Sequence, residues 1–324
     1  MNHATRQPLY KQIEAERKSR VVSFITGERV GLETQIANDA VSPFVSILDN
    51  IGPTKKISLI LETTGGHTSA AWRLINLIKS FCDELEVIIP TKAMSAGTLM
   101  ALGAQNIVMT KQAALGPIDP SLANHPLAPV INFAPGRQGK VSVSAEAVRG
   151  YIDEIKKDIS DPTALSNVWI NLARQIHPLI LGDIFRVGEQ IRSMASELIG
   201  SQVSDSEIKA KIIQLLCSDS GSHDYTLNRR KAKEIGLKVE KPGQTLYNIL
   251  LDVTKSFGLQ LETLVALSPQ AILGTQTSVN YLFVRGLIES ADECYGFASE
   301  GTYVANVGQP PIDQRIVDGW RKLP

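Results

Sequence analysis

The sequence predicts an α/β fold in which short parallel strands alternate with helices. Residues 57–62 (ISLILE) and 87–89 are short, mostly apolar runs, which are typical of strands buried inside a sheet. Each run is followed by a glycine-containing turn and then by apolar residues at helical spacing. Because parallel strands need a crossover connection, which is usually a helix, this order predicts βα units.

The elements before these two units follow in chain order. Residues 10–20 are charged and predict a short helix that leads into a first strand at 20–25. Residues 33–49 carry apolar side chains at helical spacing, which predicts a second helix. Gly52-Pro53 breaks this helix before the strand at 57–62.

Ser95 lies at a sharp predicted turn between a strand and a helix. The strand at 87–89 ends at Pro90, and an apolar helix runs on from Thr98. A serine on such a turn exposes its hydroxyl, and the backbone N–H of Ala96 behind it can donate to a developing oxyanion. The alternative is that Ser95 only caps the helix, as most serines before helices do.

A second glycine-containing turn, TTGG at residues 63–66, follows the strand at 57–62. Two glycines at a strand-to-helix corner let the backbone approach a ligand closely and point N–H groups into a cleft. Alone, this motif would be interpreted as a plain tight turn. Together with MSAG, it predicts a hydroxyl at Ser95 between two oxyanion donors, the N–H groups of Gly66 and Ala96.

The chain changes character after Pro120. Residues 121–140 contain several prolines and few helix formers, which predicts a loop. A helix then begins after Ser144, which is a good N-cap. Further helices are predicted at 165–200, with a kink at Pro178, and at 205–217. His177 in the first of these has apolar neighbours, so we interpret it as a core histidine.

Lys241-Pro242-Gly243 is the best candidate for a domain boundary, which predicts a core at residues 1–240 and an extension at 241–324. The extension contains a predicted helix at 245–257. Two β-rich stretches follow, and they are predicted to pair as a hairpin across the charged segment ESADE; they are residues 279–284 and 295–304.

Composition argues against several classes of function. Lysine plus arginine equals aspartate plus glutamate at 33 each, so no net charge favours nucleic acid or an anionic membrane. The three cysteines form no CxxC pair and the five histidines show no metal-ligand spacing, so neither a disulfide framework nor a metal site is predicted. The polar N-terminus and the lack of a run of about 18 apolar residues predict a cytoplasmic chain without a transmembrane segment.

These motifs together resemble the serine peptidases of the ClpP/crotonase fold, specifically the signal peptide peptidase A and serine dehydrogenase proteinase group. The likeness rests on ISLILETTGG, AMSAGTLMALGAQNIVM and ALGPIDP, with a later match at residues 225–237. It covers roughly residues 20–240 and implies a spiral of βα units, to which residues 241–324 add a C-terminal helical and β-hairpin appendage. Because arms of this kind often mediate self-association in this fold, a homo-oligomer is predicted. The likeness also implies cleavage through an acyl-enzyme without cofactor. With no P-loop in the sequence, ATP would not be used by this chain itself.

The resemblance also indicates a general base. In signal peptide peptidases of this fold a lysine lies just before the helix that follows the active-site loop, and Lys140 has that place here. A lysine accepts a proton from serine only in its neutral form, which requires an apolar setting. The alternative is a solvated lysine in a basic loop. ClpP itself uses a histidine and an aspartate. The candidates for these roles here are His125, or His223 with Asp224. The alternative for His223 and Asp224 is that they are turn residues.

The predicted function is therefore a serine endopeptidase. Ser95 would attack a peptide carbonyl, Lys140 would accept its proton, and the N–H groups of Gly66 and Ala96 would bind the oxyanion. Two alternatives stay open. One is a crotonase-like acyl-CoA enzyme, although crotonases usually have an AxGGG-like turn where this chain has MSAGT, and the other is a non-catalytic scaffold. The sequence assigns no peptide specificity.

Overall fold

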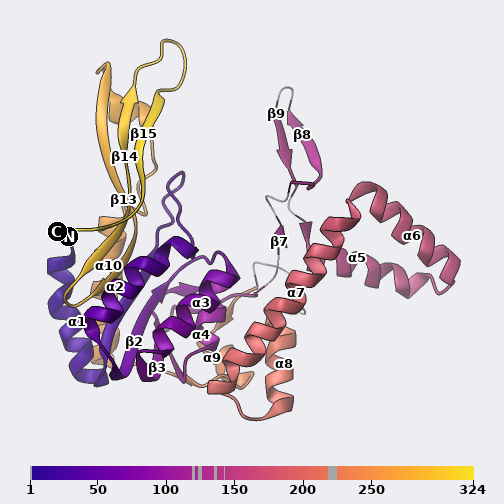
Figure 1. Ribbon diagram of the computed structural model, residues 1–324, viewed down its shortest axis with the longest axis horizontal. Helices are drawn as coiled ribbons and strands as arrows, with labels where there is room; N and C mark the ends of the chain where they lie inside the picture. Colours follow the sequence, from indigo (N-terminus) through magenta and orange to yellow (C-terminus); the bar gives the residue numbers. More distant parts are fainter. Residues whose placement is uncertain (1, 119–120, 123–125, 135–136, 142, 218–224) are drawn as a thin grey trace.

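The computed structural model is a layered α/β structure from which two parts project (Figure 1). It describes all residues except 1, 119–120, 123–125, 135–136, 142 and 218–224. The helices are α1 (His3–Arg17), α2 (Val41–Ile51), α3 (Thr68–Lys79), α4 (Ala96–Leu102), α5 (Ala145–Asp158), α6 (Pro162–Gln175), α7 (Pro178–Leu198), α8 (Ser206–Cys217), α9 (Arg229–Glu234), α10 (Gln244–Gln260) and α11 (Pro269–Leu273), with 3₁₀ turns η1 (Asn38–Ala40) and η2 (Ile199–Ser201).

The strands form one large sheet and three small ones. They are β1 (Arg20–Thr26), β2 (Thr54–Glu62), β3 (Cys82–Ile89), β4 (Lys92–Ala93), β5 (Asn106–Met109), β6 (Ala114–Leu115), β7 (Ser121–Leu122), β8 (Val130–Ala134), β9 (Arg137–Lys140), β10 (Val143–Ser144), β11 (Leu227–Asn228), β12 (Val239–Glu240), β13 (Ser278–Ser290), β14 (Cys294–Val304) and β15 (Ile312–Lys322).

The large sheet has the order β12-β5-β3-β2-β1-β13-β14-β15. The strands from β12 to β1 run parallel, which confirms the predicted crossovers. β13 pairs antiparallel with β14, which confirms the predicted hairpin. β13 also pairs antiparallel with β1. Strands from both sides of the expected boundary at residue 240 therefore belong to one sheet.

Helices cover both faces of the parallel strands, which explains why β2 reads as a continuous apolar run. Successive side chains of a strand point to opposite faces. Leu59 and Leu61 therefore pack in the cluster that contains α2, α3 and α4, whereas Ile60 packs with α1 and α10. The TTGG turn at residues 63–66 and the turn that carries Ser95 lie at the carboxyl ends of these strands.

Two parts project from this core (Figure 1). One consists of the distal ends of β13, β14 and β15. The other consists of α5, α6 and the first half of α7, which share their own apolar cluster, together with the β8–β9 hairpin. Among the described residues no helix is both long enough and apolar enough to pass through a membrane.

Some predicted helix boundaries are confirmed and others are wrong. Ser144 caps α5 by accepting a hydrogen bond from the N–H of Ala147 at 3.0 Å, as expected. The helix predicted at 165–200 is two helices, because Pro178 occupies the first position of α7, where its missing N–H has no cost. His177 is an exposed N-cap of α7 and not a core histidine. The helix expected from residue 33 begins only at Val41.

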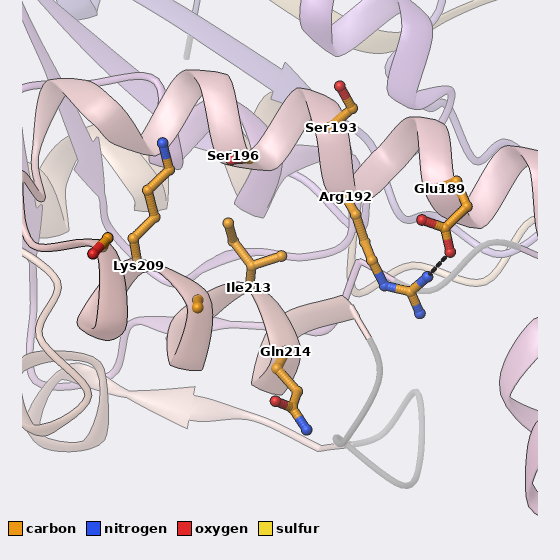
Figure 2. Close-up of a pocket in the computed structure, with 9 residues that line it drawn as sticks. Glu189, Arg192, Ser193, Ser196, Lys209, Ile213 and Gln214 are labelled. Carbon is orange, nitrogen blue, oxygen red and sulfur yellow. Dashed lines mark hydrogen bonds and ion pairs between the residues drawn. The ribbon is translucent and has the colours of Figure 1, made fainter.

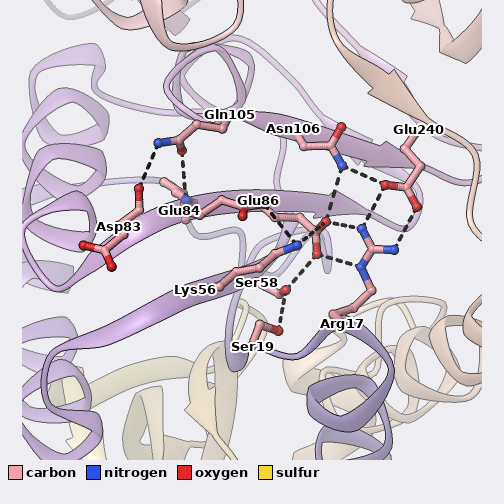
Figure 3. A network of polar contacts seen from close by, with 11 residues as sticks. Arg17, Ser19, Lys56, Ser58, Asp83, Glu84, Glu86, Gln105, Asn106 and Glu240 are labelled. Carbon is pink, nitrogen blue, oxygen red and sulfur yellow. Dashed lines mark hydrogen bonds and ion pairs between the residues drawn. The ribbon is translucent and has the colours of Figure 1, made fainter.

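A buried polar network joins α1 to the sheet at the amino ends of its strands (Figure 3). Glu86 of β3 is fully buried and accepts hydrogen bonds from Arg17 and Ser58. Burial opposes ionisation of Glu86, but the hydrogen bonds from Arg17 and Ser58 outweigh it and lower the pKa of this carboxyl. Arg17 also pairs with Glu240 of β12 at 2.8 Å. The network therefore fixes the end of the sheet opposite the TTGG turn and the Ser95 turn.

Candidate active site

Ser95 lies on the turn between β4 and α4 in a strained conformation. Its backbone has φ 50° and ψ −114°, a combination that residues other than glycine rarely adopt. Such strain costs about 1–3 kcal/mol and persists only where the surrounding structure imposes it, typically at functional sites. The half-buried side chain makes no capping hydrogen bond to α4. The hydroxyl of Ser95 therefore does not act as a helix cap.

The TTGG turn lies directly against Ser95. A Cβ atom placed on Gly65 would be 2.8 Å from the Cβ of Ser95 and 3.0 Å from the carbonyl oxygen of Met94. The same position is 3.4 Å from the backbone nitrogen of Ala96. Gly65 also has a φ of +118°, which side chains disfavour. The two turns can therefore meet only because residue 65 has no side chain.

Two backbone N–H groups at these turns are available to a ligand. Ala96 is the first residue of α4, so its N–H has no acceptor within the helix. Around Gly66, the carbonyl of Gly65 accepts from Ile36 and the N–H of His67 donates to Ile36, each at 2.8 Å. Within the described part of the chain, neither Gly66 nor Ala96 donates its N–H to a protein acceptor. These are the two N–H groups that the sequence predicts as donors of an oxyanion hole.

Thr63 holds the two turns together, a role that the sequence did not predict. Its hydroxyl oxygen accepts hydrogen bonds from the N–H of Gly65 at 3.0 Å and from the hydroxyl of Thr26 at 2.8 Å. Its backbone N–H donates to Lys92 at 3.1 Å, and its carbonyl accepts from Met94 at 3.0 Å. The only signal in the sequence was a threonine two residues before a glycine, which suits a side-chain-to-backbone turn.

Gly97 completes the close contact between the two turns. A Cβ atom there would be 2.4 Å from the methyl carbon of Thr63. Next to it, the hydroxyl of Thr98 donates to the carbonyl of Ala93 at 2.7 Å and accepts from the N–H of Gly116 at 3.1 Å. The small residues of MSAG therefore serve close packing around the serine rather than helix formation alone.

Lys140 is not next to Ser95 in this conformation. It lies on β9, opposite Val130 of β8, with an exposed side chain. The β8–β9 hairpin projects well away from α4 (Figure 1). The rival candidates, which are His125, His223 and Asp224, lie outside the described residues.

A separate open groove of about 840 Å³ lies between α7 and α8 (Figure 2). It is lined by hydroxyl and charged side chains, and Arg192 pairs with Glu189 across one turn of α7 at 2.5 Å. The residues that line it include none of the candidate catalytic residues. The groove is therefore separate from the candidate active site, although its volume is large.

Gly65→Ala is expected to slow phosphonylation of Ser95 by about 10²-fold, because the new methyl group displaces the serine from its reactive geometry. The measurement is the rate of covalent labelling by a fluorophosphonate. Gly200→Ala is the control, since a Cβ there meets nothing within 4 Å and should leave the rate unchanged. A normal rate in folded Gly65→Ala would show that contact between the two turns is unimportant for reactivity.

The first half of the chain matches a known protein family. Residues 1–161 match the family described as ClpP-like SDH-type serine proteinase. Two uncharacterized proteins of Methanocaldococcus jannaschii are 29% identical over 187 residues and 28% identical over 239 residues. These alignments cover 57% and 71% of this chain, and 54% and 69% of the relatives. The chain thus spans about half the length of the first relative.

Two solved structures of a 1510-N membrane-bound stomatin-specific protease are also similar, both of mutant forms. The first has a TM-score of 0.36 and 16% identity, and the match covers 64% of this chain and 75% of that one. The second, in complex with a substrate peptide, has a TM-score of 0.37 and 17% identity, with 67% and 74% covered. By the family match over residues 1–161, the chain belongs to the ClpP-like SDH-type serine proteinases.

Proposed function

We propose that this chain is a serine endopeptidase with Ser95 as its nucleophile. The observation that carries the proposal is the strained backbone of Ser95, which holds a hydroxyl without a capping bond against the TTGG turn at Gly65. The hydroxyl oxygen attacks a peptide carbonyl, and the N–H groups of Gly66 and Ala96 bind the oxyanion of the tetrahedral intermediate. The amine leaves with the proton that was taken from Ser95, and water then hydrolyses the acyl-enzyme.

In this proposal Lys140 accepts the proton of Ser95. Its place in the segment between the serine turn and α5 is the one that the family resemblance implies for a lysine base. The active state then requires the β8–β9 hairpin to lie closer to α4 than it does here. Such a movement would also shield the reacting groups from water, which is what favours a neutral lysine.

The test is intact-mass labelling with a fluorophosphonate, followed by peptide mapping of the adduct. A single adduct on Ser95 is expected. Lys140→Ala should slow the labelling by about 10²- to 10⁴-fold, the usual contribution of a general base. Lys156→Ala removes an exposed lysine from α5 and should leave the rate unchanged.

Other outcomes of this experiment select the alternatives. Normal labelling of Lys140→Ala, with loss in His125→Ala, would assign the base to histidine. Folded protein that does not label would favour the non-catalytic scaffold. Turnover of acyl-CoA thioesters without peptide cleavage would favour a crotonase-like enzyme.

We also propose that the enzyme is a cytoplasmic homo-oligomer that assembles through residues 241–324. The distal ends of β13 and β15 expose apolar side chains, including Leu282 at 53% and Ile316 at 79%. Sedimentation should give a multiple of the 35.2 kDa chain mass, and Ile316→Lys should shift the protein toward the monomer. A monomeric wild type would remove this proposal without affecting the peptidase assignment.

A further inference from the structure

A second pocket lies behind the catalytic turns, on the face of the sheet covered by α10. It has a volume of about 400 Å³. Its walls come from the carboxyl ends of β1 and β2, from the segment that leads to Ser95, and from α10 and the turn after it. The lining residues are Ile25, Thr26, Glu28, Glu62, Thr91, Lys92, Thr254, Phe257, Gly258, Leu261, Thr263 and Leu264.

The pocket gathers buried oxygens that have no hydrogen-bond partner. In the described chain, four buried side-chain oxygen or nitrogen atoms make no hydrogen bond, and three of them belong to residues of this pocket. These three are Glu62 Oε2, Thr91 Oγ1 and Thr254 Oγ1. A buried polar atom without a partner is costly, so three of them in residues that line one cavity are consistent with a ligand that donates hydrogen bonds once the side chains turn toward it.

The charges of the pocket favour a cationic ligand. Lys92 is the one cation among the lining residues, and it already pairs with Glu28 at 2.5 Å. Glu62 therefore has no cation of its own. Its burial, with Glu28 nearby, raises the pKa of the Glu62 carboxyl, although Lys92 and the nearby hydroxyl of Thr91 act in the opposite direction. A bound cation would compensate the ionised form of Glu62.

The apolar residues that line the pocket indicate what the ammonium group is attached to. Ile25, Phe257 and Leu261 supply apolar surface, which suits a short alkyl stem. A primary ammonium group offers three N–H donors, which equals the number of unpartnered oxygens. Threonine in a helix has two accessible χ1 rotamers, so the hydroxyl of Thr254 on α10 can turn toward such a group.

We propose that this pocket binds an alkylammonium group, with Glu62, Thr91 and Thr254 accepting its N–H hydrogen bonds. The group could belong to a free amine or to a lysine side chain. Binding does not depend on the proposed peptidase activity. It would nevertheless act on the catalytic turns, because Glu62 precedes Thr63, and Lys92 accepts the hydrogen bond of the Thr63 N–H at 3.1 Å.

The experiment measures the thermal unfolding midpoint of the whole chain with n-butylamine hydrochloride at pH 7, where an alkylamine is charged. A ligand of this size is expected to bind with a Kd of about 1 mM. The titration therefore extends to about 100 mM. The midpoint should rise with butylammonium, and not with n-butanol or with KCl at equal ionic strength. A blocked lysine peptide tests the second source, and its binding in place of butylammonium would assign the pocket to peptides.

Matched variants locate the binding. Glu62→Gln keeps the shape of the side chain and should remove the midpoint shift. Thr254→Val should weaken binding by about tenfold through the loss of one acceptor. Asp252→Asn removes an exposed charge from the same helix and should bind normally.

Three results would overturn the proposal. An equal shift with KCl would show a general effect of ionic strength, and an equal shift with n-butanol would make the pocket merely apolar. No shift in wild type with either ammonium probe would leave it without the proposed ligand. Each result can be read independently of fluorophosphonate labelling, so the failure of this proposal and the failure of the peptidase assignment are distinguishable.

Discussion

Replacing Ser95 with glycine is expected to abolish fluorophosphonate labelling and to stabilise the fold at the same time. The labelling is lost because the nucleophile is removed. The stability rises because glycine adopts φ 50° and ψ −114° without strain. The strain of about 1–3 kcal/mol is relieved, less the 0.5–1 kcal/mol or so that glycine costs in backbone entropy, which leaves a gain of about 1 kcal/mol.

The measurements are urea unfolding and intact-mass labelling of the same preparations. Ser95→Ala should lose the adduct without the gain in stability, because alanine keeps the strain. Lys18→Gly is the matched control: Lys18 is exposed, has φ 51° and lies outside the site, so this change should stabilise the protein without affecting labelling. Destabilisation by Ser95→Gly would show that the backbone conformation is not strained.

Much of the local structure followed from local sequence signals. The apolar runs of β2 and β3, the Ser144 cap and the β13–β14 hairpin are each specified by neighbouring residues, and each is found where it was expected. The turn at Ser95 was predicted in the same way from one strand, one helix and the small residues between them. These local signals therefore indicate which secondary-structure element forms at each place.

The conformation of the site depended on contacts that local signals do not contain. The angles of Ser95 arise where Gly65 lies against it, and the pattern MSAG gives no backbone angle. The hydroxyl of Thr63 is fixed by Thr26, which lies 37 residues earlier on another strand. Similarly, only the family resemblance indicates Lys140 as the general base, and no local signal gives the position of the β8–β9 hairpin that carries it.

The pairing of β13 with β1 shows the same limit on a larger scale. Residues 241–324 were expected to form an appendage, and turn and strand signals gave no indication of their partner. In the structure β13 enters the core sheet next to β1, and its buried Glu289 meets Arg6 of α1. A charged residue in a strand near the end of the chain is interpretable only once its partner near the beginning is known.

Arg6→Met is expected to cost about 3–5 kcal/mol of unfolding free energy, because it leaves a buried carboxylate without its partner. Arg6 and Glu289 are both fully buried, and the guanidinium donates two hydrogen bonds to the carboxylate, at 2.8 and 2.5 Å. Tyr10 donates another to Glu289 at 2.6 Å. The measurement is urea unfolding, in which the midpoint should fall without a change of slope.

Two further variants separate the missing partner from the missing contact. Arg6→Met combined with Glu289→Leu should recover most of the loss, since replacing both charges by apolar groups removes the unpaired carboxylate. Arg20→Met breaks two more exposed pairs, with Asp292 and with Glu14, each at 3.0 Å, and it should cost about 1 kcal/mol. If Arg6→Met cost no more than Arg20→Met, α1 would not be anchored to β13 by this pair. The N-terminal helix and the C-terminal strands would then be joined mainly by their apolar contacts, and the core sheet would not need the ion pair for its stability.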